Sequence, residues 1–345
     1  MIRYLAGMQR KLWNLLVFLF IQSAMAQVGG RSTFEFLNLI SSPRQAALGG
    51  KVITIYDDDV NAPLFNPATI NVDMGNQLAV NFVDYLGDVT YGSASYAYTY
   101  DRHVQTFHAG VTYINYGTFE GRDINGEFTN SFRGNEVALS MGYARNILFT
   151  DFYVGGSVKL ISSQLEDFTS LGGAVDLGLI YVNERWGVNM SVVIRNLGVQ
   201  FTKFDDRRED LPFEVIAGIS QKLNHLPFRW HLTMENLQQW DTTFENPERN
   251  REGVGENVVD GDVSFINNAF RHLLAGVEFF PDKAINLRLG YNFRRGEELR
   301  FVEQRSFAGI SAGFGIKINN LKFNYTFAKY TTAVNSSFFG LNIYL

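Results

Sequence analysis

The feature that most constrains this chain is a repeated alternation of apolar and polar side chains in segments of about ten residues. In residues 285–294, Ile285, Leu287 and Leu289 share one face, and the polar side chains share the other. A period of two is that of a β-strand, and about ten residues suffice for a tilted strand to cross a bilayer. Strands of soluble sandwiches also alternate, but they are usually about five or six residues long. The repeats therefore predict a transmembrane β-barrel.

About fourteen alternating segments follow one another from residue 78 to the end of the chain. They begin near Leu78, Thr90, Val104, Gly134, Asp151, Leu171, Trp186, Pro212, Phe228, Phe270, Ile285, Arg305, Leu321 and Ser336. Bacterial barrels use an even number of antiparallel strands. We therefore predict an all-β fold, a transmembrane antiparallel β-barrel of about 14 strands.

The gaps between these segments predict how the barrel is oriented. Every even-numbered gap is short, whereas the odd-numbered gaps include the long stretches 117–133, 198–211, 239–269 and 296–304. Outer-membrane barrels have short periplasmic turns and longer extracellular loops. We therefore expect an integral outer-membrane protein with both chain ends in the periplasm and the long loops extracellular.

The first 26 residues have the three parts of a secretory signal peptide. Basic residues (Arg3, Arg10 and Lys11) precede the apolar run 12–21, and Ala24-Met25-Ala26 fits a cleavage site. The apolar run has about ten residues, and a membrane-spanning helix needs about twenty. We therefore expect residues 1–26 to be removed on export.

Residues 27–77 do not alternate and are rich in turn formers, such as Gly49-Gly50 and Asn66-Pro67. Such a segment before a barrel is either a periplasmic tail or a plug inside the lumen, and we favour the plug. The expected organisation is a signal peptide (1–26), an N-terminal plug or hatch (27–77) and an outer-membrane barrel (78–345).

Composition narrows the classes of function. The net charge of −5, without a strongly basic run, argues against nucleic acid as a partner. The chain has no cysteine, which excludes a lipoprotein anchor. The mean hydropathy of −0.08 fits a barrel, whose strands turn half of their side chains to a polar lumen.

No set of residues predicts catalysis. Gly309-Ile310-Ser311-Ala312-Gly313 matches the G-x-S-x-G pattern of serine hydrolases, but the alternation runs through it where that pattern needs a strand, a turn and a helix. The five histidines are scattered without metal-ligand spacing, and Asp57-Asp58-Asp59 is better read as a solvated turn than as a cation site. We expect no enzyme activity, no cofactor and no metal.

The predicted lumen faces carry charges of both signs. The basic residues are Lys159, Arg195, Arg229, Arg288, Arg294 and Lys317, and the acidic ones are Glu136, Asp176, Glu214, Glu235 and Glu278. If such groups form ion pairs between neighbouring strands, their side chains fill the lumen of the barrel. This pattern favours a filled scaffold over a wide pore or an apolar tunnel.

Five stretches of the chain resemble the PorQ family, outer-membrane components of the type IX secretion system of Bacteroidetes. They are residues 29–39 (GGRSTFEFLNL), 46–50 (AALGG), 56–61 (YDDDVN), 211–214 (LPFE) and 235–241 (ENLQQWD). PorQ is similar to PorV and, more distantly, to the FadL fatty-acid transporters, which are fourteen-stranded barrels with an N-terminal hatch. Asn66-Pro67-Ala68 resembles the N-P-A element of that hatch.

The resemblance implies a role in binding, without catalysis. PorQ-like proteins belong to a cell-surface attachment complex with PorU, PorV and PorZ, in which PorQ holds PorZ on the membrane and cargo is processed and attached. Outer-membrane lipid, including lipopolysaccharide, would surround the barrel. Residues expected to meet a partner lie in the long loops: Arg122, Asp123, Asp205, Trp240, Phe244, Arg249 and Arg251. The alternative function is a FadL-type transporter of small hydrophobic molecules.

Overall fold

A computed structural model of the chain describes residues 32–101, 105–204, 208–223, 225–240, 265–298, 308–329 and 335–345. The predicted signal peptide and the first residues of the predicted plug lie outside this part. No helix among the described residues is long and apolar enough to cross a membrane.

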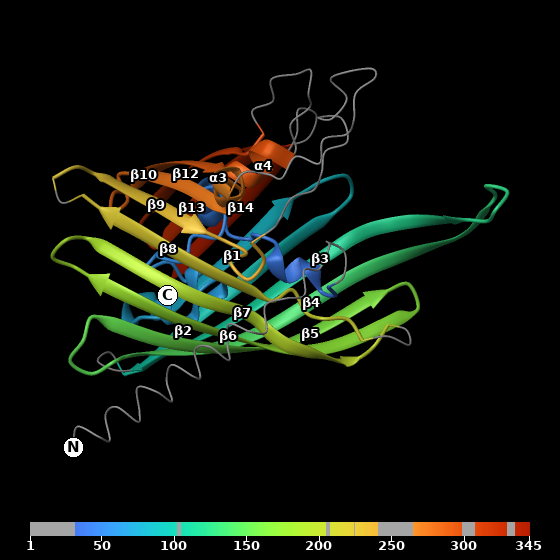
Figure 1. Ribbon diagram of the computed structural model, residues 1–345, viewed down its shortest axis with the longest axis horizontal. Helices are drawn as coiled ribbons and strands as arrows, with labels where there is room; N and C mark the ends of the chain where they lie inside the picture. Colours follow the sequence, from blue (N-terminus) through green and yellow to red (C-terminus); the bar gives the residue numbers. More distant parts are fainter. Residues whose placement is uncertain are drawn as a thin grey trace.

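Fourteen antiparallel strands form one closed barrel, which confirms the predicted fold class (Figure 1). Strand β1 pairs with β14 from Gln77↔Tyr344 to Asp84↔Ser337 and closes the cylinder. Closure leaves no strand edge in the wall, as a bilayer requires. The strands are β1 (Gln77–Asp84), β2 (Thr90–Asp101), β3 (Gln105–Arg122), β4 (Phe128–Asn146), β5 (Phe152–Leu165), β6 (Phe168–Asn183), β7 (Val188–Thr202), β8 (Glu214–Lys222), β9 (Phe228–Met234), β10 (Leu273–Phe279), β11 (Ile285–Asn292), β12 (Ile310–Ile318), β13 (Leu321–Lys329) and β14 (Asn335–Tyr344).

The two ends of the barrel differ. At the end where β1 begins and β14 finishes, here called the turn end, the connections are short, from residues 319–320 to residues 147–151. The opposite loop end carries the longer connections, between β7 and β8, β9 and β10, and β11 and β12. This distribution is the one expected from the alternating gaps in the sequence.

The outer face of the wall is apolar. Alternate side chains such as Leu139, Leu160, Leu179 and Leu287 are exposed, whereas their neighbours along each strand point inward. Leucines exposed in such a continuous band are stable only against lipid, because a soluble protein rarely shows so large an apolar surface to water. The wall is that of an integral membrane barrel.

One predicted loop is mostly strand. Strand β3 continues to Arg122 and β4 begins at Phe128, so the expected loop 117–133 contains only the turn 123–127. Past Asn115 and Gly134 these strands pair with each other but not with β2 or β5, and they form a hairpin arm beyond the wall (Figure 1, right). Because both faces of the arm are exposed, its sequence has the polar, glycine-containing character of a loop.

Two strand limits were also wrong, and in both cases a short helix replaces strand. Residue Phe270 lies in helix α3 (Phe265–Arg271), and β10 begins only at Leu273. Strand β11 ends at Asn292, so Arg294 belongs to helix α4 (Phe293–Glu298) and not to a lumen-facing strand. Both helices stand at the loop end.

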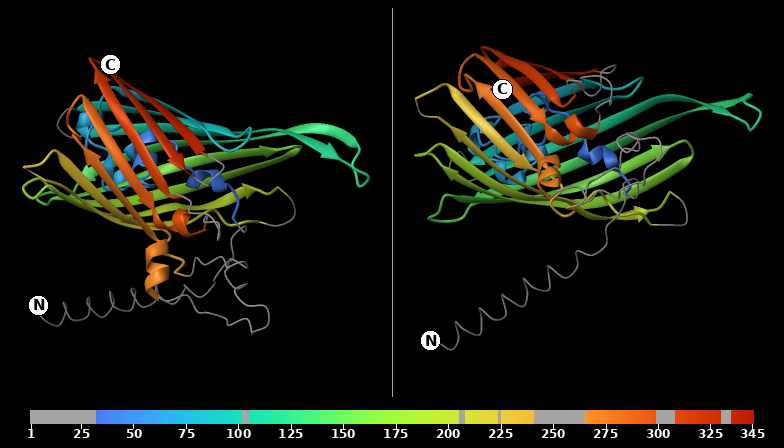
Figure 2. Two further views of the ribbon diagram at one scale, coloured as in Figure 1. Left: turned by 90° about the horizontal axis from the view of Figure 1, so that it is seen from above. Right: turned by 45° about the horizontal axis from the view of Figure 1, so that its top comes forward.

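The N-terminal segment, residues 32–76 and here called the plug, runs through the lumen (Figure 2). Its short helices are η1 (Glu35–Asn38), α2 (Pro43–Ala47), η2 (Ala62–Leu64), η3 (Pro67–Thr69) and η4 (Val72–Met74). Helix α2 packs against β11 to β14, η3 against β4 to β6, and η4 against β2 and β3. The plug therefore touches opposite sides of the wall at once.

Candidate functional site

The centre of the barrel holds a buried cluster of charges that joins the plug to the wall. Arg44 of α2 donates through Nε and Nη2 to both carboxylate oxygens of Glu278 on β10, at 2.8 and 2.9 Å. The same guanidinium donates to Asp57, at 2.8 and 2.9 Å, and to Asp59, at 3.3 Å. A bidentate pairing of this kind fixes both distance and orientation.

Glu278 is also the partner of two arginines in the wall. Arg229 on β9 lies 3.4 Å from its Oε2, and Arg288 on β11 donates to its Oε1 at 2.9 Å. Arg229 reaches Asp57 of the plug as well, at 2.8 Å. One carboxylate therefore faces three guanidinium groups, of which those of Arg44 and Arg288 are buried. The charges of the plug and of the wall neutralise each other.

A second cluster lies beside the first, on the neighbouring strands β5 to β8. Lys51 of the plug donates to both oxygens of Glu214 on β8, at 2.7 and 2.8 Å, and Arg195 on β7 reaches the same carboxylate at 3.1 Å. Beside it, Lys159 on β5 lies 2.6 Å from Asp176 on β6. The predicted pairing of lumen charges across strands is thus confirmed, and the plug adds partners that the strands alone do not supply.

The other lumen charges expected from the sequence have separate positions. Glu136 accepts a hydrogen bond from Tyr116 at 2.5 Å. Lys317, near the turn end, lies 3.9 Å from Asp58. Glu235 is buried just past the end of β9. Asp57, Asp58 and Asp59 therefore meet cations of this chain, and the described residues contain no acidic or histidine cluster able to hold a metal ion.

The residues Asn66-Pro67-Ala68 dock the plug on β5, β6 and β7. Asn66 Oδ1 accepts from the Ala68 N–H at 3.0 Å, and its Nδ2 donates to the Ile53 carbonyl at 2.7 Å and to Ser191 Oγ at 2.9 Å. Every polar atom of this buried amide side chain is used. The wall has glycine where this segment contacts it: Gly155 on β5 and Gly178 on β6 are paired across the two strands. A Cβ on Gly155 would lie 2.4 Å from the Pro67 carbonyl carbon.

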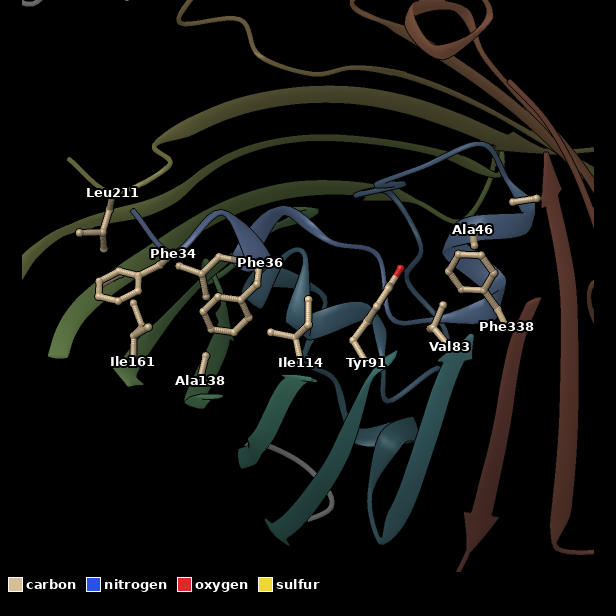
Figure 3. Close-up of a cluster of buried hydrophobic side chains, with 13 residues drawn as sticks. Phe34, Phe36, Ala46, Val83, Tyr91, Ile114, Ala138, Ile161, Leu211 and Phe338 are labelled. Atoms are coloured by element: carbon tan, nitrogen blue, oxygen red, sulfur yellow. The ribbon is translucent and has the colours of Figure 1, made fainter. Parts of the chain in front are cut away.

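Apolar side chains close the lumen towards the loop end (Figure 3). Phe34 and Phe36 of the plug pack against Ile114, Ala138 and Ile161 of the wall. A cavity of about 30 Å³ remains beside this layer, lined by Leu37, Phe65, Lys159 and Arg195 among others. That is room for a water molecule or two and too little for an organic ligand.

Four of the five G-x-S-x-G residues, Ile310 to Gly313, lie in strand β12, and Gly309 directly precedes it. Ser311 is buried, and its Oγ donates to the Ala47 carbonyl of the plug at 3.1 Å. Gly313 faces Ala47 as well, where a Cβ would come within 2.8 Å of the alanine side chain. These small residues make room for helix α2, as expected of small residues in an alternating strand that face the lumen.

The three predicted partner residues that the structure describes, Arg122, Asp123 and Trp240, do not form one site. Arg122 ends strand β3 at the tip of the hairpin arm, and Asp123 opens the turn, where its Oδ1 accepts from the N–H groups of Asn125 and Glu127 at 2.9 Å each. These bonds hold the pKa of the Asp123 carboxyl below its usual range. Trp240 lies beside helix α3, away from the arm. Asp205, Phe244, Arg249 and Arg251 fall outside the described residues.

The charge cluster should keep the plug docked in mild acid. Burial alone would raise the pKa of Asp57, but Arg44 and Arg229 outweigh it and hold that pKa well below its usual range. A lowered pKa gives stability that is present above the unfolded-state value, about 3.9, and is lost as the pH falls through the folded-state value. We therefore expect the urea midpoint of the Asp57→Asn variant to lie below that of the wild type at neutral pH. The two should converge only in strong acid, and convergence already near pH 5 would contradict this assignment.

Comparison with known proteins gives likenesses of structure alone. No family model and no curated protein matches the chain. A TodX variant, described as a monoaromatic hydrocarbon channel, is 13% identical, covers 90% of this chain and 98% of its own, and has a TM-score of 0.52. The toluene transporter TbuX of Ralstonia pickettii (15% identical, 92% and 98% covered, TM-score 0.49) and a FadL homologue of Pseudomonas aeruginosa (10%, 92% and 99%, 0.46) are also similar. The likeness to TodX shows the fold alone, that of a closed β-barrel.

Proposed function

We propose that this chain is a sealed outer-membrane barrel that works by binding and not by conducting. The filled lumen is the observation that carries this proposal. The plug is tied to β10 by Arg44–Glu278 and to β8 by Lys51–Glu214, and its helices α2 and η3 pack against opposite sides of the wall. The described lumen cavity beside its apolar layer holds only about 30 Å³. With the turn end in the periplasm, the loop end and its hairpin arm face the outside of the cell.

The resemblance to the PorQ family supplies the partner in this proposal. The chain would hold PorZ at the cell surface, in one attachment complex with PorU and PorV, and would support processing and attachment of cargo. The arm ending at Arg122 and Asp123 is the docking surface we favour, because its two strands stand free of the wall and expose both faces.

A second candidate, transport of small hydrophobic molecules, is favoured by the likeness in fold to a hydrocarbon channel. An apolar groove of about 600 Å³ on the lipid-facing side of β6 to β9, lined by Leu179, Met190, Val192, Ile219 and Leu232 among others, offers a surface for such molecules. Passage through the barrel would require the plug to leave both of its charge clusters, which argues for the first candidate.

Deletion of the gene should separate the two functions. If the chain anchors PorZ, the deletion strain is expected to release PorZ from the surface and to leave cargo unprocessed or in the medium, as measured by immunoblots of cells and medium. The deletion strain is then complemented with a variant whose arm is shortened across residues 118–132. We expect this variant to insert in the membrane but not to retain PorZ at the cell surface. Normal PorZ retention together with reduced uptake of toluene would instead favour transport.

A further inference from the structure

Helix α3 (Phe265–Arg271), at the loop end between β9 and β10, is amphipathic in the reverse sense. Two of its three polar side chains, Asn268 and Arg271, are 6% and 9% exposed and face the protein, whereas Asn267 is exposed. Its aromatic side chains Phe265 and Phe270 are 71% and 47% exposed. A helix on a protein in water turns its apolar face to the core. The reversed arrangement is that of the barrel strands, which turn apolar side chains to lipid.

The exposed aromatic face is held in a fixed position. The Trp240 ring stacks on Phe265 at 4.9 Å and on His272 at 5.1 Å. The Trp240 carbonyl accepts from Asn268 Nδ2, and His272 Nε2 lies 3.0 Å from the same oxygen. On the other side, Phe270 packs against Phe293 of α4 at 5.6 Å. Asn268 on the polar side of α3 thus helps to hold the helix against Trp240, and the aromatic side chains of the helix stay exposed.

The strands below α3 are among the shortest in the wall, where β1 also has only 8 residues. Strands β9 and β10 have 7 residues each and β11 has 8, whereas β4 has 19. At about 3.3 Å per residue and a tilt of about 40°, seven residues rise about 18 Å, which is less than the apolar band of about 25 Å of an outer-membrane barrel. On this side the strands alone leave several ångströms of the lipid boundary uncovered.

Helices α3 and α4 stand where that apolar band is missing. Helix α4 follows directly on β11, and α3 leads into β10, whose neighbours β9 and β11 show Leu232 and Leu289 to the lipid. In Figure 2 (left) α3 projects sideways from the barrel and not along its axis. Because α3 leads into β10, we take its exposed aromatic side chains as an extension of the apolar belt of the wall.

We propose that α3 lies in the membrane leaflet at the loop end, which is the outer leaflet in the orientation proposed above, with Phe265 and Phe270 among lipid acyl chains. The helix completes the apolar belt where β9 to β11 are too short to do so. Trp240 then anchors the barrel at the interface, as aromatic rings do in membrane proteins, and it is not a contact for a protein partner. This assignment is independent of any role in PorZ binding or transport.

Quenching of tryptophan emission by brominated lipid tests this proposal. In the full chain, all four tryptophans (Trp13, Trp186, Trp230 and Trp240) are replaced by Phe, and Phe270→Trp is added as the only reporter. The protein is inserted into vesicles of phosphatidylcholine brominated on its acyl chains. We expect a loss of emission comparable with that of a variant retaining only Trp230, which shares the lipid-facing side of β9 with Leu232.

The same background provides the opposite control. Ile124→Trp, at the fully exposed tip of the arm, should be quenched by aqueous iodide and not by the brominated lipid. If Phe270→Trp behaves like Ile124→Trp, α3 faces water and the proposal is wrong, since the face is then free for a soluble partner. Quenching by neither agent would also refute it, because the rest of the chain would then cover the face. Heat-modifiable gel mobility verifies insertion of each variant, and Phe265→Trp is a second reporter on the same face.

Discussion

Replacing Glu278 by alanine is expected to lower the free energy of unfolding by about 3–5 kcal/mol and to loosen the plug. Glu278 is 0% exposed and is the shared partner of Arg44, Arg229 and Arg288. Its removal leaves buried cations without their counter-charge, and burying an uncompensated charge costs more than an intact pair contributes. Because Arg44 belongs to the plug, the penalty falls on the docked state.

Two measurements test this expectation in detergent micelles. Urea unfolding gives the loss of stability, and limited trypsin digestion detects release of the plug, because Arg44 and Lys51 become cleavable once the segment leaves the lumen. Glu278→Gln keeps the shape of the side chain but removes its charge, and it should also lower the free energy of unfolding and expose the plug to trypsin. Asp282→Asn is the matched control: it removes an exposed carboxylate paired with Lys222, and should change stability by less than about 1 kcal/mol. Equal losses for Glu278 and Asp282 variants would contradict a structural role for the buried cluster.

The barrel itself could be predicted from the sequence because each strand carries its own evidence. In β11 the lipid-facing side chains Ile285, Leu287 and Leu289 alternate with lumen-facing Asn286 and Arg288, so both the strand and its two faces can be read without knowing any neighbour. The strand order followed from the same reading, because short connections force neighbouring segments to pair. The number of strands and the difference between the two ends of the barrel could therefore be predicted.

Contacts between the plug and the wall could not be predicted, because they join residues that are far apart in the chain. Arg44 and Glu278 are separated by 234 positions, and nothing near either of them indicates the other. The sequence showed that the lumen carries charges of both signs, but not that Arg44, Lys51 and Asp57 of the plug would complete their pairing. Spacing along a chain does not encode contacts of this range.

The errors at the loop end have a different origin. The arm of β3 and β4 lacks the apolar face of a wall strand, since water surrounds both of its sides, and its composition is therefore that of a loop. The end of helix α3 was read as the start of a strand because Phe270 lies only three residues before Leu273, where β10 begins. A short helix facing lipid and a strand facing lipid both present exposed aromatic residues, so that signal alone does not separate them.

Two adjacent glycines of β5, Gly155 and Gly156, face opposite sides of the wall. In the sequence Gly155 and Gly156 are equivalent, but in the barrel Gly155 faces the plug and Gly156 does not. A Cβ on Gly155 would lie 2.4 to 2.5 Å from backbone atoms of Pro67 and Ala68. On Gly156 its nearest atoms would be at ordinary contact distance, Leu177 at 3.6 Å and the Asp176 carbonyl at 3.8 Å. Backbone atoms cannot rotate away as a side-chain end can. Gly155→Ala must therefore move Asn66-Pro67-Ala68 off the wall.

We expect Gly155→Ala to lower the free energy of unfolding by about 1–3 kcal/mol, as overpacking does, and to make the plug more sensitive to trypsin. Gly156→Ala should leave the plug protected and slightly raise stability, by roughly 0.5 kcal/mol, since alanine is less costly to order in a strand than glycine. Urea unfolding and digestion of the two variants side by side measure both effects. Because the substitutions differ only in the face they occupy, a plug that is equally protected in both would mean that Asn66-Pro67-Ala68 is not seated on β5.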